Sequence, residues 1–270
     1  MSRIIIAMTD DHYQSLQRWF TAHVQTFREP DPEHQRSIDL KEGHTLRVCA
    51  ITERIATGLG LDANSRLLAA TIALFHDLGR FLQYQRYRTF RDPDSENHAK
   101  LSIRQLHHHQ LLHGLGPTER QLIQRAIIFH NRPRLPDHLD PATQFHSRLI
   151  RDADKVDILR LMVEEFSLPE ALRNPVVSLG LAAESGVRDV VYQHLFAGRL
   201  MNYQELRNTD EFKVLLMSWV FDINFRPTFE ILRQRDAFAT LAATLPNTPI
   251  HQQVCAFINA HIDRCLAVPK

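Results

Sequence analysis

The stretch with the clearest capacity for chemistry is residues 69–80, AATIALFHDLGR. Its apolar residues predict a helix that delivers His76 and Asp77 side by side at its inner end. Burying an imidazole and a carboxylate is costly unless each group is paired or binds a metal. An isolated pair of this kind more often marks a helix that ends in solvent, so the rest of the chain must decide between the two interpretations.

Further ionisable residues fall on other apolar helical segments. His44 shares a predicted helix face with Val48 and Ile55, His98 opens a helix, and His130 ends one. Any single histidine of this kind is more often a satisfied core residue than a ligand. Several helices that each contribute such a group favour metal, because bundle cores are where such sites are built. The candidate metal ligands are His44, His76, Asp77, His98, His130 and Asp154.

The motif RDADKVD at 151–157 offers two candidate carboxylates, which the helical period separates. Asp154 has isoleucines four residues before and after it, so we expect it to face the core. Asp152 has an arginine four residues before it and a lysine three after it, which predicts a surface ion-pair ladder. Asp157 is expected near the face of Asp154 as a supporting group. The three histidines at 107–109 point in different directions on a helix and are expected at the surface.

The mixture of imidazole and carboxylate predicts the kind of cofactor. Such ligands suit a divalent transition metal (Mn, Fe, Ni, Co or Zn), with Mg possible, whereas an all-oxygen set would indicate Mg or Ca. Four of the six groups complete one site. All six, with one shared carboxylate, can hold two ions with open positions for water. The sequence leaves open whether one ion or two are bound.

The elements that must position these groups are predicted to be helices. Glycine is scarce, at nine residues, and apolar residues recur at intervals of three and four. Gly79 is expected to let the chain turn into a loop over residues 81–97. The expected helices cover, with approximate bounds, residues 10–27, 38–58, 64–76, 98–113, 118–130, 141–166, 187–196, 209–222, 226–243 and 249–266.

Composition limits the class of protein. The 270 residues are 44% hydrophobic, with a net charge of +1 that gives no strong signal for a nucleic-acid partner. Three scattered cysteines and the absence of a long apolar window predict a cytoplasmic protein with no membrane association. We expect one all-helical domain over 1–270, with a core at about 38–166 and a helical extension at about 167–270. The sequence does not indicate an oligomeric state.

The order of the candidate ligands resembles that of the HD-domain superfamily of metal-dependent phosphohydrolases. The resemblance covers about residues 40–165, and rests on His44, then His76-Asp77, then Asp154 within ADKVD. It implies a bundle of helices with these residues as ligands. His98 and His130 match further histidines of the two-metal branches. NHAKLSIRQL and HDLGR are similar to motifs of HD-GYP phosphodiesterases, with Arg80 in the place of a phosphate-contacting lysine.

The chain departs from that branch in several places. A single His130 followed by Asn131 replaces a pair of histidines, no GYP motif follows, and Leu40 stands where a glutamate would precede the first histidine by one turn. These differences argue against cyclic di-GMP as the substrate. The HDxxED motif of alarmone hydrolases is absent as well.

The resemblance implies hydrolysis of a phosphomonoester or phosphodiester, in a small and nucleotide-like substrate, by attack of a metal-bound hydroxide. Asp77 would bridge the ions, and Arg80 would neutralise charge on the phosphoryl oxygens. Arg86, Arg88 and Lys100 are candidates to extend the contact with phosphate, although a solvated basic loop explains them about as well. Two alternatives remain: a di-iron oxygenase on the same fold, and a non-catalytic module in which metal only stabilises the bundle.

Overall fold

Helices make up the regular structure of residues 8–174, 181–182 and 186–267, which are the residues that the computed structural model describes. Within them, Ala182 and Asn208 form one isolated bridge. The predicted all-helical class is confirmed. The chain divides into two compact units, Met1–Asp154 and Lys155–Lys270. A single domain over the whole chain, with a core at about 38–166, stays a prediction.

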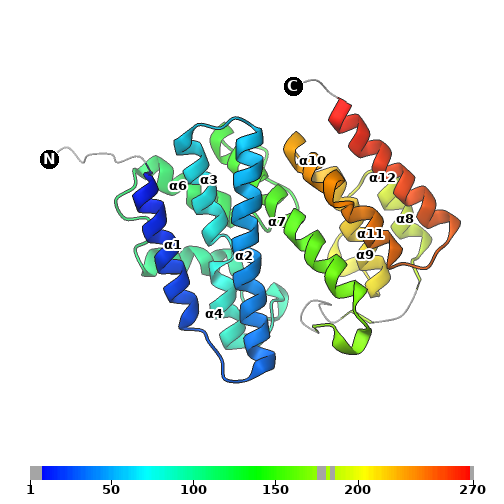
Figure 1. Ribbon diagram of the computed structural model, residues 1–270, viewed down its shortest axis with the longest axis horizontal. Coiled ribbons are helices and arrows are strands. Elements are labelled where there is room, and N and C mark those ends of the chain that lie inside the picture. The colour runs from blue at the N-terminus through cyan, green and yellow to red at the C-terminus, as the bar shows by residue number, and fades with distance from the viewer. Residues whose placement is uncertain (1–7, 175–180, 183–185, 268–270) are drawn as a thin grey trace. The chain divides into compact units, whose positions relative to one another are not determined.

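The first unit contains the candidate ligands. Its helices are drawn in blue to green in Figure 1. Its helices, with the last one continuing into the second unit, are α1 (Asp10–Gln25), α2 (Pro32–Gly58), α3 (Ala63–Phe75), α4 (Leu78–Tyr87), α5 (His98–His108), α6 (Pro117–Phe129) and α7 (Pro141–Ser167). A 3₁₀ turn, η1 (Asp92–Asp94), interrupts the segment between α4 and α5.

Local sequence explains where these helices begin. Asp31 accepts hydrogen bonds from the backbone amides of the first turn of α2, and Pro32 has a φ already suited to that turn. The helix therefore starts six residues before the predicted position near 38. Asp62 and Asn97 cap α3 and α5 in the same way. The predicted start of α5 at His98 is confirmed.

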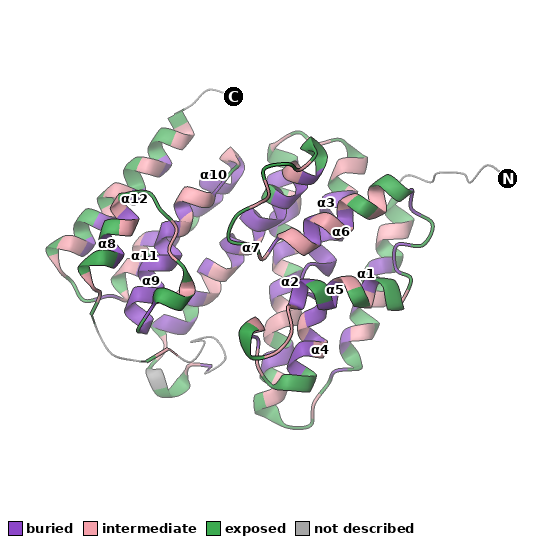
Figure 2. Cartoon of the chain, turned by 180° about the vertical axis from the view of Figure 1, so that it is seen from behind, coloured by how far each residue is buried: buried purple, intermediate pink, exposed green. Residues whose placement is uncertain are grey.

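The packing of α3 and α4 against their neighbours forms the core of the first unit. α3 contacts α1, α2 and α6, while α4 contacts α2 and α5. The buried faces of these helices are visible in Figure 2. Phe75 at the end of α3 and Phe81 in α4 are both almost fully buried, on either side of the corner where the two helices meet. The candidate ligands thus lie within a tightly packed core.

The second unit is also helical. It comprises η2 (Glu170–Leu172), α8 (Asp189–Phe196), η3 (Tyr203–Glu205), α9 (Thr209–Ser218), η4 (Trp219–Asp222), α10 (Arg226–Arg235), α11 (Ala237–Ala243) and α12 (Pro249–Ala267). α12 packs on α8, α10 and α11. The predicted helix over 226–243 is in fact two, because Asp236 adopts a left-handed φ of 47° that ends α10. Among the described helices, none has the length and hydropathy needed to span a bilayer.

Candidate metal centre

The site is built around the corner between α3 and α4. His76 closes α3, and Asp77 has non-helical angles (φ −106°, ψ 14°) just before α4 begins at Leu78. The predicted loop over residues 81–97 is therefore wrong in its first part, since residues 81–87 belong to α4. The turn occurs at Asp77 itself, and this places its side chain and that of His76 on the inside of the corner.

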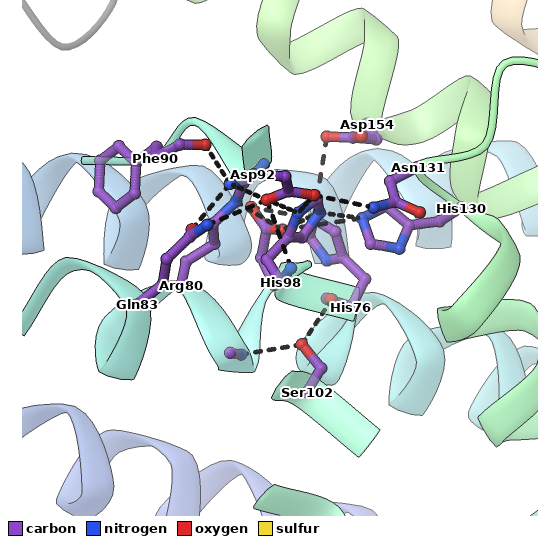
Figure 3. A network of polar contacts seen from close by, with 12 residues as sticks. His76, Arg80, Gln83, Phe90, Asp92, His98, Ser102, His130, Asn131 and Asp154 are labelled. Atoms are coloured by element: carbon purple, nitrogen blue, oxygen red, sulfur yellow. Dashed lines mark hydrogen bonds and ion pairs between the residues drawn. The ribbon is translucent and has the colours of Figure 1, made fainter. Parts of the chain in front are cut away.

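Gly79 lies inside α4, and its predicted role in the turn is also wrong. A Cβ atom at this position would lie 2.3 Å from the carbonyl oxygen of His98 and 2.6 Å from the amide nitrogen of Ser102, so only glycine allows α5 to approach so closely. The Gly79 amide donates to Ser102 Oγ at 2.8 Å, and that hydroxyl donates to the carbonyl oxygen of His76 at 2.9 Å. These bonds hold the first residue of α5, His98, against the corner (Figure 3).

Three of the histidines have their tautomers fixed by their surroundings. Nδ1 of His76 lies 2.7 Å from the carbonyl oxygen of Ala73, and Nδ1 of His130 lies 2.6 Å from that of Ile127. Nδ1 of His98 lies 2.8 Å from both oxygens of Asp92. Because these acceptors have no proton to give, each Nδ1 carries the hydrogen and each Nε2 presents a lone pair. This is the arrangement found when histidines bind metal through Nε2.

Burial keeps the imidazoles of His76 and His98 neutral. It lowers the pKa of His76 to about 4, and burial with the nearby Arg80 guanidinium lowers the pKa of His98 to about 3. Among the described residues, His76 Nε2 is buried and has no hydrogen-bond partner. An orphaned, unprotonated and inward-facing nitrogen fits a site made for a cation, since it would otherwise cost stability.

The two carboxylate oxygens of Asp77 face two different pairs of histidines. Oδ2 lies 3.7 Å from His44 Nε2 and 3.8 Å from His76 Nε2. Oδ1 lies 3.4 Å from His98 Nε2 and 3.7 Å from His130 Nε2. A carboxylate placed between two sets of donors has the geometry needed to bridge two ions.

Asp154 approaches the same cluster from α7. Its Oδ1 lies 3.1 Å from His44 Nε2 and 3.8 Å from His76 Nε2. Burial would raise the pKa of this carboxyl, but the His44 and His76 imidazoles beside it lower the pKa below its usual range. Burial likewise opposes ionisation of Asp77, whose pKa is nevertheless held well below normal by Lys41, His76 and Arg80. Both carboxylates are therefore ionised at neutral pH.

All six predicted ligands meet at this place. They form three overlapping groups with potential ligand atoms within 4.8 Å of one another, namely His44–His76–Asp77, His76–His130–Asp154 and Asp77–His98–His130. The predicted surface position of Asp152 is wrong, because its side chain is fully buried. α7 is buried on several faces at this level, so the helical period there does not separate core from surface. The histidines at 107–109 are exposed or half-buried, as predicted.

The residues predicted to contact phosphate differ from one another in burial and in their partners. The Arg80 guanidinium donates to Gln83 Oε1, to the carbonyl oxygen of Phe90 and to Asp92 Oδ1. Arg86 pairs with Glu96 and Arg88 with Glu29, and both arginines are largely exposed. Lys100 is exposed on α5. No contact joins Arg86, Arg88 or Lys100 to the ligand cluster among the described residues.

Two charged residues of the site were not singled out from the sequence. Lys41 donates from Nζ to Asp77 Oδ2 at 2.8 Å, and it lies one helical turn before His44, a spacing that could have indicated it. Asp92 holds His98 and also accepts from Gln83 and Asn131. Its position in an irregular segment gave no periodic signal. Burial would raise the pKa of Asp92, but the hydrogen bond from His98 and the charges around it lower the pKa to about 2.

Comparison with known proteins identifies the region that contains this cluster. The family model of the HD domain matches residues 42–159. The matched range begins two residues before His44 and ends five after Asp154, so it includes every predicted ligand. No curated protein and no solved structure matches the chain.

Proposed function

Since residues 42–159 make this chain a member of the HD-domain superfamily, we propose that it is a metal-dependent phosphohydrolase. The substrate would be a small phosphomonoester or phosphodiester of nucleotide type. One observation carries the proposal: the two oxygens of Asp77 face separate pairs of histidines whose Nε2 atoms converge on them.

The residues present fit a divalent transition metal. The imidazoles of His76 and His98 are neutral, the two carboxylates are ionised, and His76 Nε2 has no hydrogen-bond partner among the described residues. This donor set suits Mn, Fe, Co, Ni or Zn. The residues that would hold one or two ions are His44, His76, Asp77, His98, His130 and Asp154. When bound, such ions supply Lewis acidity toward a phosphoryl oxygen and lower the pKa of water to roughly 7.

The chain itself contributes orientation and charge. Asp92 fixes the proton of His98 on Nδ1, and the backbone carbonyls of Ala73 and Ile127 do the same for His76 and His130. These contacts cost no reorganisation when a substrate arrives, which is the property that makes a polar site effective in catalysis. The basic groups Arg80 and Lys41 lie beside Asp77 and offer positive charge to a phosphoryl anion.

The test begins with metal analysis of the purified full chain. Generic aryl phosphomonoesters and phosphodiesters are then assayed with Mn, Fe, Co, Ni, Zn or Mg added singly to the metal-free protein. Phosphate-ester cleavage that depends on the metal supports the proposal. Oxygen uptake with bound iron and no ester cleavage would instead indicate the oxygenase, and no turnover with any ion would indicate the non-catalytic module.

A further inference from the structure

Lys41 is a charged residue of the site with unused hydrogen-bonding capacity. Its Nζ donates to Asp77 Oδ2 at 2.8 Å and lies 5.2 Å from the centre of the Phe90 ring. Among the described residues Asp77 is its one hydrogen-bond acceptor, so two of the three N–H donors of the ammonium are available. Its side chain is 14% exposed, against 4% for Asp77, so solvent reaches part of this lysine.

Arg80 is placed differently. Its Nη1 is committed to Gln83, to the Phe90 carbonyl and to Asp92, which ties α4 to the segment that holds His98. A phosphate could recruit this nitrogen only by breaking those bonds. The remaining close contact of the guanidinium is Nε, 3.5 Å from Asp77 Oδ1. The Nη1 nitrogen of Arg80 therefore supports the loop, whereas its Nε is buried and has no hydrogen-bond partner among the described residues.

The position of Lys41 also means that a metal ion bound by Asp77 would lie close to a second positive charge. Asp77 Oδ2, which accepts its hydrogen bond, is the same oxygen that faces His44 and His76. If that oxygen binds a cation, the ammonium is left beside a second positive charge at short range, and the repulsion is strong in a poorly hydrated site. An anion that contacts both positive groups removes the repulsion. A phosphoryl oxygen has the required charge, and lysine binds phosphate as a point charge without a fixed geometry.

We propose that Lys41 contacts the phosphoryl group of the substrate, in a site where Asp77 joins this cation to the metal ligands. The inference rests on the proposed function and adds its substrate-binding residue. It also predicts that the anionic group binds at the edge of the cluster next to Phe90 and α2.

The experiment measures binding of inorganic phosphate to the metal-loaded full chain by isothermal titration calorimetry, with metal content determined on the same samples. The variants are Lys41→Met, which keeps a long side chain without the charge, and Lys41→Arg, which restores the charge. Arg104→Met is the control, because Arg104 is an exposed cation on α5 that pairs with Glu96 away from the cluster. Circular dichroism melting verifies that each variant is folded.

The expected result is a loss of about tenfold in phosphate affinity for Lys41→Met at unchanged metal content, with Lys41→Arg close to wild type and Arg104→Met unchanged. Unchanged phosphate affinity in Lys41→Met, or no phosphate binding by the loaded wild type, overturns the inference. Metal content that changes in Lys41→Met without a change in phosphate affinity overturns it too, since Lys41 would then act on the ions through Asp77. Absence of metal from the wild type is a separate result, which refutes the proposed function itself.

Discussion

Nε2 of His98 and Nε2 of His130 lie 3.1 Å apart, and neither nitrogen can donate a hydrogen to the other. The proton of each ring is on Nδ1, held by Asp92 in one case and by the Ile127 carbonyl in the other. Two lone pairs at this distance repel unless a cation lies near both. Asp77 Oδ1, at 3.4 and 3.7 Å from the two nitrogens, supplies the negative charge that such a cation would share.

This relationship makes Asp92 a positioning residue for the pair of histidines that faces Asp77 Oδ1. In Asp92→Asn the charge that holds the His98 proton on Nδ1 is lost, so we expect the affinity for the ion near Asp77 Oδ1 to fall by about 10- to 100-fold. Metal analysis after dialysis should show fewer ions per chain than in the wild type. The matched control is Asp94→Asn, because Asp94 lies two residues away and pairs with Arg91 at the surface. Equal metal content in the two variants would contradict the assignment.

Removal of the shared carboxylate should have a larger effect. Asp77→Asn keeps the size of the side chain but removes the charge that faces all four histidines, so we expect loss of the bound metal and no ester cleavage above the metal-free background. His76→Ala should also lose activity and metal, because His76 belongs to two of the three ligand groups. The exposed His107→Ala should behave as wild type. Full activity in either cluster variant would refute the site.

The ligand residues could be predicted from sequence because their type conflicts with their surroundings. His44 interrupts an apolar face of α2, and the His76-Asp77 pair ends an apolar α3. Such conflicts are visible without knowledge of the fold. The helical class followed from the same periodicity.

Other features depended on tertiary packing and could not be predicted in this way. The close approach of α5 to Gly79 is a property of two helices, whereas the glycine alone suggests a turn. Asp152 looked exposed because its charged neighbours along α7 suggest a ladder, yet its side chain is fully buried. Two of the partners of Arg80, Phe90 and Asp92, lie ten and twelve residues away outside α4, so its motif alone suggested a phosphate contact.

Gly79 should tolerate no side chain. In Gly79→Ala the added methyl group would meet the backbone of His98 and Ser102, which cannot move without separating α4 from α5, so we expect a loss of about 3 kcal/mol or more in the free energy of unfolding. Urea denaturation measures this value. In the control Gly43→Ala, inside α2, the new methyl group meets only the flexible end of Arg47, so stability should stay level or rise by up to about 1 kcal/mol. Equal stability in the two variants would show that the α4–α5 contact is looser than described.

A buried histidine outside the cluster should make stability depend on pH. His146 is 6% exposed, its Nδ1 is buried without a hydrogen-bond partner among the described residues, and burial lowers its pKa to about 4. In the unfolded chain the pKa is near 6.5, so between pH 6.5 and 4 the unfolded state binds more protons and the free energy of unfolding falls as the pH falls.

The variant His146→Leu removes this dependence and the buried unpaired nitrogen with it. At pH 5.0 we expect the difference between variant and wild type to exceed that at pH 7.5 by about 2 kcal/mol in favour of the variant. Urea denaturation of both proteins in the metal-free form, with chelator present, isolates this effect from metal release. The exposed His108→Leu serves as the control and should show no such change with pH. A constant difference between His146→Leu and wild type at both pH values would mean that His146 is already accessible to protons in the folded chain.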